Sequence, residues 1–169
     1  EFFLTTTSTN SFSFSISAAG EFIVNWGDGT VETITKPDTT KTTYSHTYST
    51  RKSYTIKLAG QATAYNTNTT TAAISFSSSA SKIASIDGSL GAIFGTLSSD
   101  TNNQPSFDGT FSGASNMTGS IPSDLFAGIS GAPASYMFYR TFLNCRGLTS
   151  IPENLFAGIS GAPARRMFD

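Results

Sequence analysis

Side chains suited to nucleophilic or metal chemistry are scarce in this sequence. The 169 residues include one histidine, His46, and one cysteine, Cys145. A Ser-His-Asp arrangement would have to use His46, and a Cys-His pair would need both residues, which lie in different segments. This count excludes zinc sites built from several Cys and His, and it excludes a disulfide within the chain. We therefore predict no catalytic residue, no metal site and no cofactor.

The 11 Asp and Glu residues are the remaining candidates for catalysis or ion binding. A glycosidase needs two carboxyl groups roughly 5–10 Å apart in a cleft. The acidic residues in recognisable motifs instead stand at expected turns and helix starts. Asp28 could bind calcium, but no second carboxylate is near it in sequence and calcium takes several oxygen ligands. We expect Asp28 to accept backbone hydrogen bonds in its turn, and we expect a protein that is not an enzyme.

Charge and composition narrow the possible partners and the cellular location. The net charge is −1, and the 10 Lys and Arg residues are scattered, so no basic stripe predicts binding to nucleic acid. No apolar run approaches the eighteen or so residues that a membrane span needs. Charged residues make up only 12%, and Ser and Thr are abundant in the first hundred residues. This composition is typical of secreted and surface-exposed proteins, so we predict an extracellular or cell-surface location.

The elements that must position these side chains begin with alternating strands in residues 1–73. The stretches "SFSFSIS", "EFIVNW" and "SYTIKL" place aromatic and aliphatic residues on one face and polar residues on the other. This period of two predicts half-buried antiparallel strands. Between two of the runs, "WGDGT" at 26–30 carries Asp28-Gly29, which is typical of a hairpin turn. We predict that residues 1–73 form a small β-sandwich.

The motifs of this half resemble those of a known family. "NWGDGT", followed about sixteen residues later by "HTY" and then by "SYTIKLAG", resembles the PKD-like (polycystic-kidney-disease-like) immunoglobulin-type domain over roughly residues 2–62. One departure is Lys52, where that family has glycine. The resemblance implies a spacer or binding module and a structural role for the motif residues, with His46 packed near Trp26. These motif residues are Trp26, Asp28, Gly29, His46, Tyr48 and Tyr54.

The second half repeats itself. "IPSDLFAGISGAPA" at 121–134 returns as "IPENLFAGISGAPA" at 151–164, and longer units begin at Phe107 and Phe138. A decayed copy precedes them and a truncated one starts at Phe168. Units of about thirty residues that cannot bury their own apolar side predict a stacked solenoid over residues 74–169. In each unit we expect a short helix around "APARRMF", a strand at "LTSIP" and a helical turn at "SDLF" or "ENLF". A polar loop is expected at 96–106.

The pattern "F..C..LTSIP..LF" is similar to the leucine-rich repeat of BspA-like bacterial surface proteins. That resemblance implies an aliphatic ladder through Ile121 and Ile151, and a packed slot for Cys145, which Ala114 occupies in the earlier copy. The expected fold class is therefore α+β: an N-terminal PKD-like antiparallel β-sandwich followed by a short leucine-rich-repeat solenoid. The two resemblances together imply a bacterial surface protein.

The leading functional expectation is a non-enzymatic extracellular protein for adhesion or ligand display, and its partner would be a protein or glycan on host or neighbouring cells. A ligand face could be formed where exposed positions differ between copies. The alternative is that these positions are solvent-exposed and have no binding role. The candidate residues are Tyr136, Tyr139, Arg140, Arg165 and Arg166. The chain ends inside a unit, which leaves two expectations: a fragment of a longer protein, or self-association through an uncapped end. The alternative function is accordingly a structural subunit of an extracellular filament or stalk.

Overall fold

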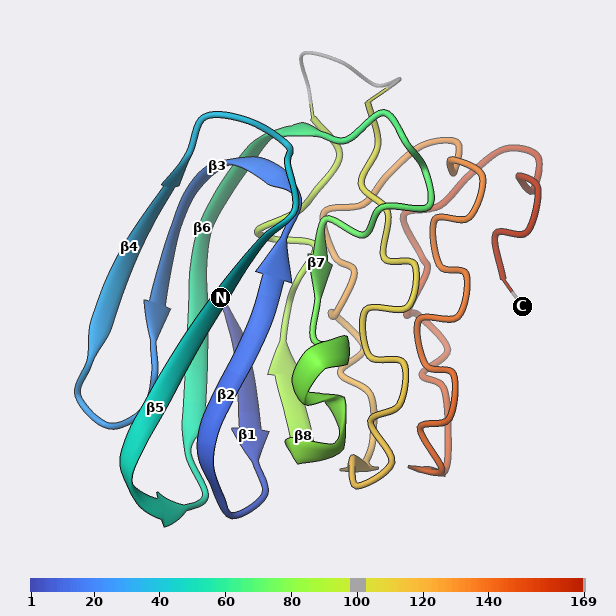
Figure 1. Ribbon diagram of the computed structural model, residues 1–169. Coiled ribbons are helices and arrows are strands. Elements are labelled where there is room, and N and C mark those ends of the chain that lie inside the picture. The colour runs from blue at the N-terminus through green and yellow to red at the C-terminus, as the bar shows by residue number, and fades with distance from the viewer. Residues whose placement is uncertain (98–102, 169) are drawn as a thin grey trace.

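The computed structural model describes residues 1–97 and 103–168, and the first half is built from two antiparallel sheets (Figure 1). One sheet has the strand order β4-β3-β6-β1-β8 and the other has the order β5-β2-β7. Residues 98–102 of the expected loop 96–106 lie outside the described residues. The strands of the two sheets are β1 (Phe2–Thr6), β2 (Thr9–Ile16), β3 (Ala18–Asn25), β4 (Val31–Lys36), β5 (Thr42–Lys52), β6 (Thr55–Tyr65), β7 (Ile74–Ser75) and β8 (Ile83–Gly88).

The alternating runs form strands, as their period predicts. Phe12, Phe14 and Ile16 of β2 are buried while the serines between them are more accessible or pair with the neighbouring strand. The "WGDGT" segment closes a hairpin between β3 and β4, in which Asn25 pairs with Val31. Gly27 and Gly29 in this loop both have positive φ, at 86° and 97°, a conformation that glycine adopts without steric cost. The first half is thus an antiparallel sheet protein compatible with a β-sandwich.

Residues beyond 73 complete both sheets. Strand β7 pairs with β2, and β8 pairs with β1 along its length, from Phe2 opposite Gly88 to Thr6 opposite Ile83. The start of the second half therefore forms one edge of each sheet, and the remaining chain packs beside that edge, opposite β4 (Figure 1).

The predicted α+β class is wrong. The chain is 39% strand and 4% helical, and the only helix among the described residues is a 3-10 helix, Ser77–Lys82. The segments expected to be helical, at 123–126, 153–156 and 162–168, form turns and bends. The expected strand at 148–152 is reduced to β10 (Gly147–Leu148), which pairs in parallel with β9 (Thr118–Gly119). A leucine-rich-repeat solenoid is therefore not found.

The second half instead contains two coils of consecutive turns, which we term the first coil (107–136) and the second coil (137–168). Within the first coil, alternate amides donate to the carbonyl three residues earlier, as Thr110 does to Phe107 at 3.1 Å. The amides between them donate to the second coil at 2.7–2.9 Å. These donor and acceptor pairs are Phe107 to Met137, Gly109 to Tyr139, Phe111 to Thr141, and Gly113 to Leu143.

This alternation explains why the expected helices are absent. An α-helix needs each amide to donate to the carbonyl four residues earlier, but half of these amides are paired with the neighbouring coil. Left-handed residues also recur at intervals of four, with Gly109 and Gly113 at φ 63° and 85° and Arg140 and Asn144 at φ 53° and 62°. Each one ends the local turn, so no helical run can grow past it.

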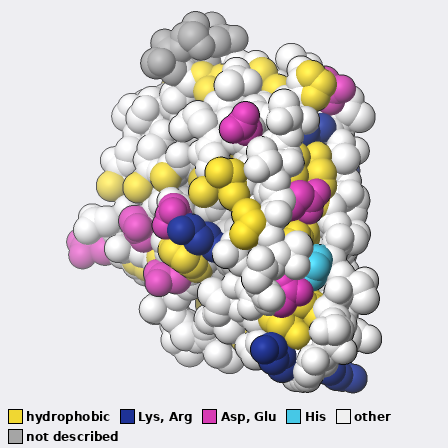
Figure 2. All heavy atoms as spheres, turned by 90° about the vertical axis from the view of Figure 1, so that its left-hand side faces the viewer, with side chains coloured by type: hydrophobic (Ala, Val, Ile, Leu, Met, Phe, Trp, Pro, Cys, Tyr) yellow, Lys and Arg dark blue, Asp and Glu magenta, His cyan; other side chains and the backbone are white. Residues whose placement is uncertain are grey.

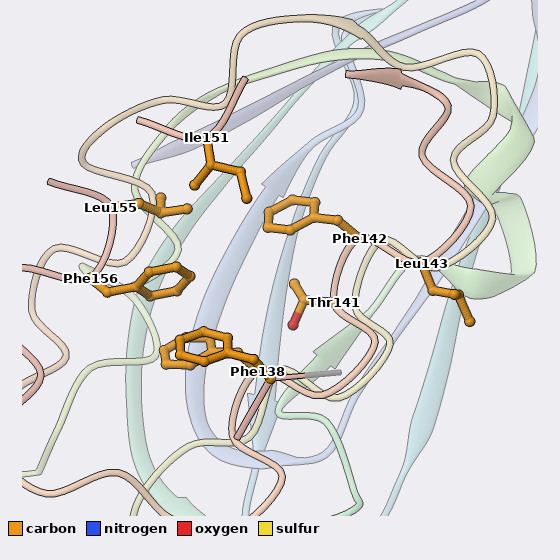
Figure 3. Close-up of a pocket in the computed structure, with 8 residues that line it drawn as sticks. Phe138, Thr141, Phe142, Leu143, Ile151, Leu155 and Phe156 are labelled. Carbon is orange, nitrogen blue, oxygen red and sulfur yellow. The ribbon is translucent and has the colours of Figure 1, made fainter. Parts of the chain in front are cut away.

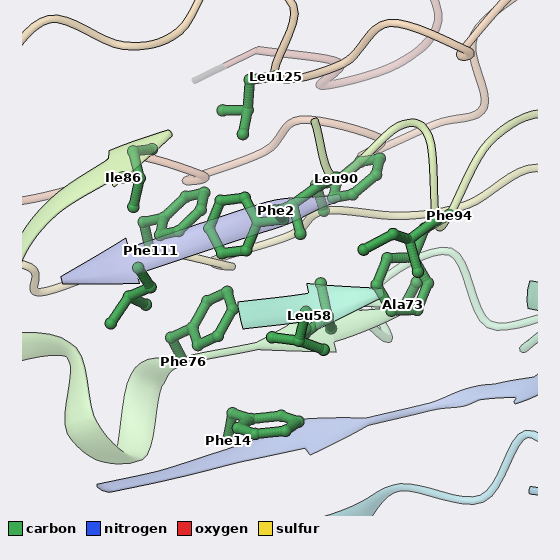
Figure 4. Close-up of a cluster of buried hydrophobic side chains, with 14 of the residues drawn as sticks. Phe2, Phe14, Leu58, Ala73, Phe76, Ile86, Leu90, Phe94, Phe111 and Leu125 are labelled. Atoms are coloured by element: carbon green, nitrogen blue, oxygen red, sulfur yellow. The ribbon is translucent and has the colours of Figure 1, made fainter. Parts of the chain in front are cut away.

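One continuous hydrophobic core joins the sheets to the coils (Figure 4). Phe111 of the first coil is fully buried, and its ring centroid lies 6.1 Å from that of Phe2 in β1 and 5.3 Å from that of Phe76. Phe142 of the second coil stacks on the other side of Phe111 at 5.5 Å and 5°. The core residues of the sandwich and of the coils are thus in direct contact.

Candidate functional site

The residues of the "WGDGT" and "HTY" motifs come together at one end of the β3–β4 hairpin. The Oδ2 atom of Asp28 accepts a hydrogen bond from Nε2 of His46 at 2.7 Å, and its Oδ1 accepts one from the Thr30 amide at 3.0 Å. The His46 ring, from β5, stacks on Trp26 with centroids 5.1 Å apart and 15° between the planes. The hydrogen bond from His46, followed by that from the Thr30 amide, lowers the pKa of Asp28 to about 2.

Two tyrosines extend this cluster into the core. Tyr48 donates its hydroxyl to the carbonyl of Trp26 at 2.9 Å, and its ring lies against Tyr54 at 3.6 Å. Tyr54 in turn donates to the carbonyl of Thr50. Burial raises the pKa of Tyr48, so its hydroxyl stays protonated and remains a donor. These hydrogen bonds and ring contacts fasten the β3–β4 hairpin to β5.

Cys145 lies between the coils. Its thiol is buried and donates to the carbonyl of Phe111 at 3.2 Å, and burial raises its pKa. A protonated, buried thiol is a poor nucleophile and a poor metal ligand. Across residues 1–97 and 103–168, no three His, Cys, Asp or Glu side chains are grouped closely enough to hold a metal ion.

Figure 2 shows the face formed on the β4 side of the sandwich, where acidic, basic and apolar side chains are interspersed and the single histidine reaches the surface. Two exposed apolar side chains of the sandwich are Ile23 of β3 and Val31 of β4, which are neighbouring strands. Acidic side chains are more widespread than basic ones on this face, and it has no continuous stripe of cations.

The five residues of the predicted ligand face, Tyr136, Tyr139, Arg140, Arg165 and Arg166, lie at turns of the two coils. The amide of Tyr136 donates to the carbonyl of Arg165 at 3.0 Å, so these two positions are neighbours. The guanidinium carbon of Arg140 lies 4.5 Å from the ring centroid of Tyr139, and Tyr139 forms an edge-to-face pair with Tyr136 at 5.4 Å. Tyr139 itself is only 8% exposed, so it supports Arg140 more than it offers surface. Arg166 is exposed in the second coil.

Three of these five residues have an unusual backbone. Tyr136, Arg140 and Arg166 have φ of 62°, 53° and 48°, in the left-handed region that costs a non-glycine residue about 1 kcal/mol or more. At the position of Arg140, the first coil has Gly109, which adopts the same conformation freely. The sequence replaces a glycine that suits this backbone with a long cationic residue that does not.

An apolar cavity opens on the outer side of the second coil (Figure 3), with a volume of about 420 Å³. The apolar residues that line this outer edge, which we term the open edge, are Phe138, Phe142, Leu143, Ile151, Leu155, Phe156 and Phe168. Ile151 is 68% exposed and Phe168 is 52% exposed. Ile121, at the position matching Ile151, is only 2% exposed because the second coil covers it, and both residues line a neighbouring cavity.

Two features of this region are not predicted by the sequence analysis above: the different exposure of Ile121 and Ile151, and the left-handed backbone of Arg140. The repeated phrase indicated that Ile121 and Ile151 are equivalent, but only the structure shows that one is covered and the other open. The left-handed backbone of Arg140 could have been found by aligning it with Gly109, because a glycine that recurs in a turn-rich repeat often marks positive φ.

No protein-family model matches the chain, and neither a curated protein nor a solved structure is significantly similar to it. Within the described residues, no helix is long and apolar enough to cross a membrane.

Proposed function

We propose that this protein is a non-enzymatic extracellular binding module, which displays a ligand face on its two coils and binds a protein or glycan on host or neighbouring cells. The single observation that carries the proposal is the cluster of aromatic and cationic side chains at adjacent coil positions. Tyr136 lies beside Arg165, and Arg140 is held over Tyr139. Tyrosine and arginine, together with tryptophan, are enriched among the residues that contribute most to binding at protein interfaces.

The backbone of these residues supports the same proposal. Residues held in costly backbone conformations tend to gather at binding and catalytic sites. Tyr136, Arg140 and Arg166 all have positive φ, a backbone conformation that is costly for residues other than glycine. A solvated position without a role has no reason to retain arginine where glycine is the better residue for the backbone.

For the sandwich we propose a PKD-like module that acts as a spacer, and for the whole protein a location on a bacterial surface. The support is that Trp26, Asp28, His46, Tyr48 and Tyr54, the residues that carry the resemblance, form one packed cluster.

The experiment is a binding assay on glycan arrays and on cultured cells, with a double variant Arg140→Gly/Arg166→Gly. Glycine suits the left-handed backbone at both positions, so we expect the variant to fold at least as well as the original chain. We expect it to lose at least tenfold in binding. The matched control is Arg51→Ala/Lys52→Ala at the end of β5, which removes the same charge from a distant exposed strand and should bind normally. Equal binding by both variants, or no binding by the unaltered chain to either target, would refute the ligand face.

The second candidate is a structural subunit of an extracellular filament or stalk. The observation that favours it is the open edge, where large apolar side chains such as Ile151 and Phe168 are exposed to water. Assembly of this kind predicts concentration-dependent growth in mass, measured by size-exclusion chromatography with light scattering. A display module remains monomeric in that measurement at all concentrations.

A further inference from the structure

We propose that a small polar pocket between the sandwich and the first coil binds one neutral sugar ring, either as a monosaccharide or as the end of a glycan. Its volume is about 180 Å³, below the range of about 300–1,000 Å³ that accommodates drug-sized ligands, so it suits a single small ring. Binding of a free monosaccharide is independent of the ligand face, whereas the extension to a whole glycan rests on the proposed function. The polar residues that line the pocket are Ser17, Lys41, Thr70, Thr71, Ser75 and Asp108.

The walls of this polar pocket come from three segments that hydrogen bonds join together. Ala73, in the loop between β6 and β7, accepts a hydrogen bond from the Ser17 amide at 2.9 Å and donates one to the Ser106 carbonyl at 2.7 Å. The hydroxyl oxygen of Ser106 accepts a hydrogen bond from the Asp108 amide at 3.2 Å. The loop, the link between β2 and β3, and the start of the first coil are therefore held in place before a ligand binds, which lowers the entropic cost of binding.

The first observation that points to a ligand is the hydroxyl group of Ser17. This residue is only 2% exposed, and within residues 1–97 and 103–168 its side chain has no hydrogen-bond partner. In that part of the chain every fully buried side-chain oxygen or nitrogen does have a partner, so the Ser17 oxygen keeps the small area through which it lines the pocket. A nearly buried hydroxyl without a partner is costly to the fold. A hydroxyl group of a bound ligand would supply that partner.

The second observation is a pair of opposite charges that have no direct partner. In the described part of the chain, the Asp108 carboxylate accepts no hydrogen bond and forms no ion pair, and burial raises the pKa of this carboxyl group. Lys41, which immediately precedes β5, likewise forms no ion pair there. A carboxylate accepts hydrogen bonds from ligand hydroxyls, and an ammonium group donates to ligand oxygens. Because the two charges cancel, the pocket favours a neutral ligand over an ionic one.

The remaining lining groups favour a sugar among the neutral ligands. Four of them are hydroxyls, and a hydroxyl both donates and accepts, as each hydroxyl of a sugar does. None of the residues that line the pocket is aromatic, so a flat aromatic ligand would gain no stacking there. Asp108 is close enough to Arg140 for their charges to interact, so a glycan whose end fills the pocket can continue over the ligand face.

The test titrates the full chain with glucose, galactose, mannose and N-acetylglucosamine in turn and follows the backbone amides by NMR. We expect at least one of these sugars to shift the amide signals of Ala72 and Asp108 with saturation at one site. Alanine and inorganic phosphate are titrated in parallel, as a zwitterion and an anion. Saturable shifts of the same amides with alanine or phosphate but with none of the sugars would overturn the proposal, and so would the absence of shifts with every probe.

Two substitutions locate the site. Ser17→Ala removes a hydroxyl that no protein group uses, so we expect an equal or higher melting temperature together with at least tenfold weaker sugar binding. Asp108→Asn removes the charged acceptor and should also weaken binding at least tenfold. The matched control is Asp124→Asn, at an exposed turn of the same coil, which should bind the sugar normally. Binding that survives both pocket substitutions, or that Asp124→Asn weakens equally, would overturn the proposal.

The same titration separates this pocket from the ligand face. Monosaccharide binding by a chain that binds neither glycan arrays nor cells would support the pocket and refute the ligand face. Binding to the arrays without monosaccharide shifts at Ala72 and Asp108 would refute the pocket and leave the ligand face standing.

Discussion

Substituting Phe111 with alanine tests whether the sandwich and the coils unfold as one unit. Its ring is fully buried and contacts Phe2 of the sandwich, Phe76 at the junction and Phe142 of the second coil. Replacing a buried phenylalanine by alanine costs roughly 3–5 kcal/mol, because transfer energy is lost and a cavity remains. For a chain of this size, 1 kcal/mol shifts the melting temperature by about 2–4 °C. We therefore expect Phe111→Ala to lower it by about 10 °C.

The sequence provides one natural reporter in each half. Trp26 is the only tryptophan and lies in the sandwich, and Cys145 is the only cysteine and lies between the coils. Urea unfolding is followed by Trp26 fluorescence and, in parallel samples, by labelling of the Cys145 thiol. If the core is one cooperative unit, both transitions move to lower urea together in Phe111→Ala.

The matched control is Phe168→Ala, whose ring is 52% exposed and ends a ladder. It removes the same atoms with less burial, so we expect a loss of about 1 kcal/mol. A single cooperative core is refuted if Phe111→Ala shifts the thiol transition and leaves the tryptophan transition in place. That result would mean that the two halves share a surface without sharing their stability.

Three further outcomes follow from single contacts. The folded pKa of Asp28, about 2, lies below the usual value, so its carboxylate stabilises the fold above about pH 4 and loses this contribution as the pH falls toward 2. Asp28→Asn should therefore flatten the curve of unfolding free energy against pH, measured with urea, between about pH 4 and pH 2. An unchanged slope would contradict the pairing of Asp28 with His46. Thr141→Val removes the hydroxyl that donates to the preceding coil and should cost about 1 kcal/mol in urea unfolding, whereas Thr141→Ser should keep the hydrogen bond, so equal losses would argue against it. Gly158→Ala would place its new methyl group against the carbonyl of Ile129 and should lower the melting temperature by several degrees. An unchanged melting temperature would mean that the two coils can move apart enough to accommodate the methyl group.

The strands of the first half were predictable because their side chains alternate over long runs. Phe12, Phe14 and Ile16 point to one face whatever the remainder of the chain does, and the glycines around Asp28 favour a hairpin locally. The sequence could not show that β7 and β8, only two and six residues long, complete the sheets. Strands this short are specified by their neighbours rather than by a pattern of their own.

The helices expected in the second half failed for a different reason. Proline at a first turn and apolar residues three or four apart are also compatible with successive turns, and sequence spacing alone does not separate the two. The decisive facts are non-local: the amide of Phe107 finds its acceptor thirty residues away in the second coil, and Arg140 holds a left-handed backbone beside the first. Helices of one or two turns are marginal in water, so pairing between coils prevails over them. The resulting fold class is nearly all β.

The same backbone pairing places the two candidate surfaces in different parts of the coils. Residues such as Phe142 must stay apolar because the neighbouring coil packs against them, as Phe111 does on Phe142, and they also line the open edge. Residues at the turn corners, such as Arg140, carry no packing requirement, so their identity can differ between coils at little cost to the core. Substitutions at the corners can therefore change the side chains of the proposed ligand face while the apolar contacts between the coils stay the same.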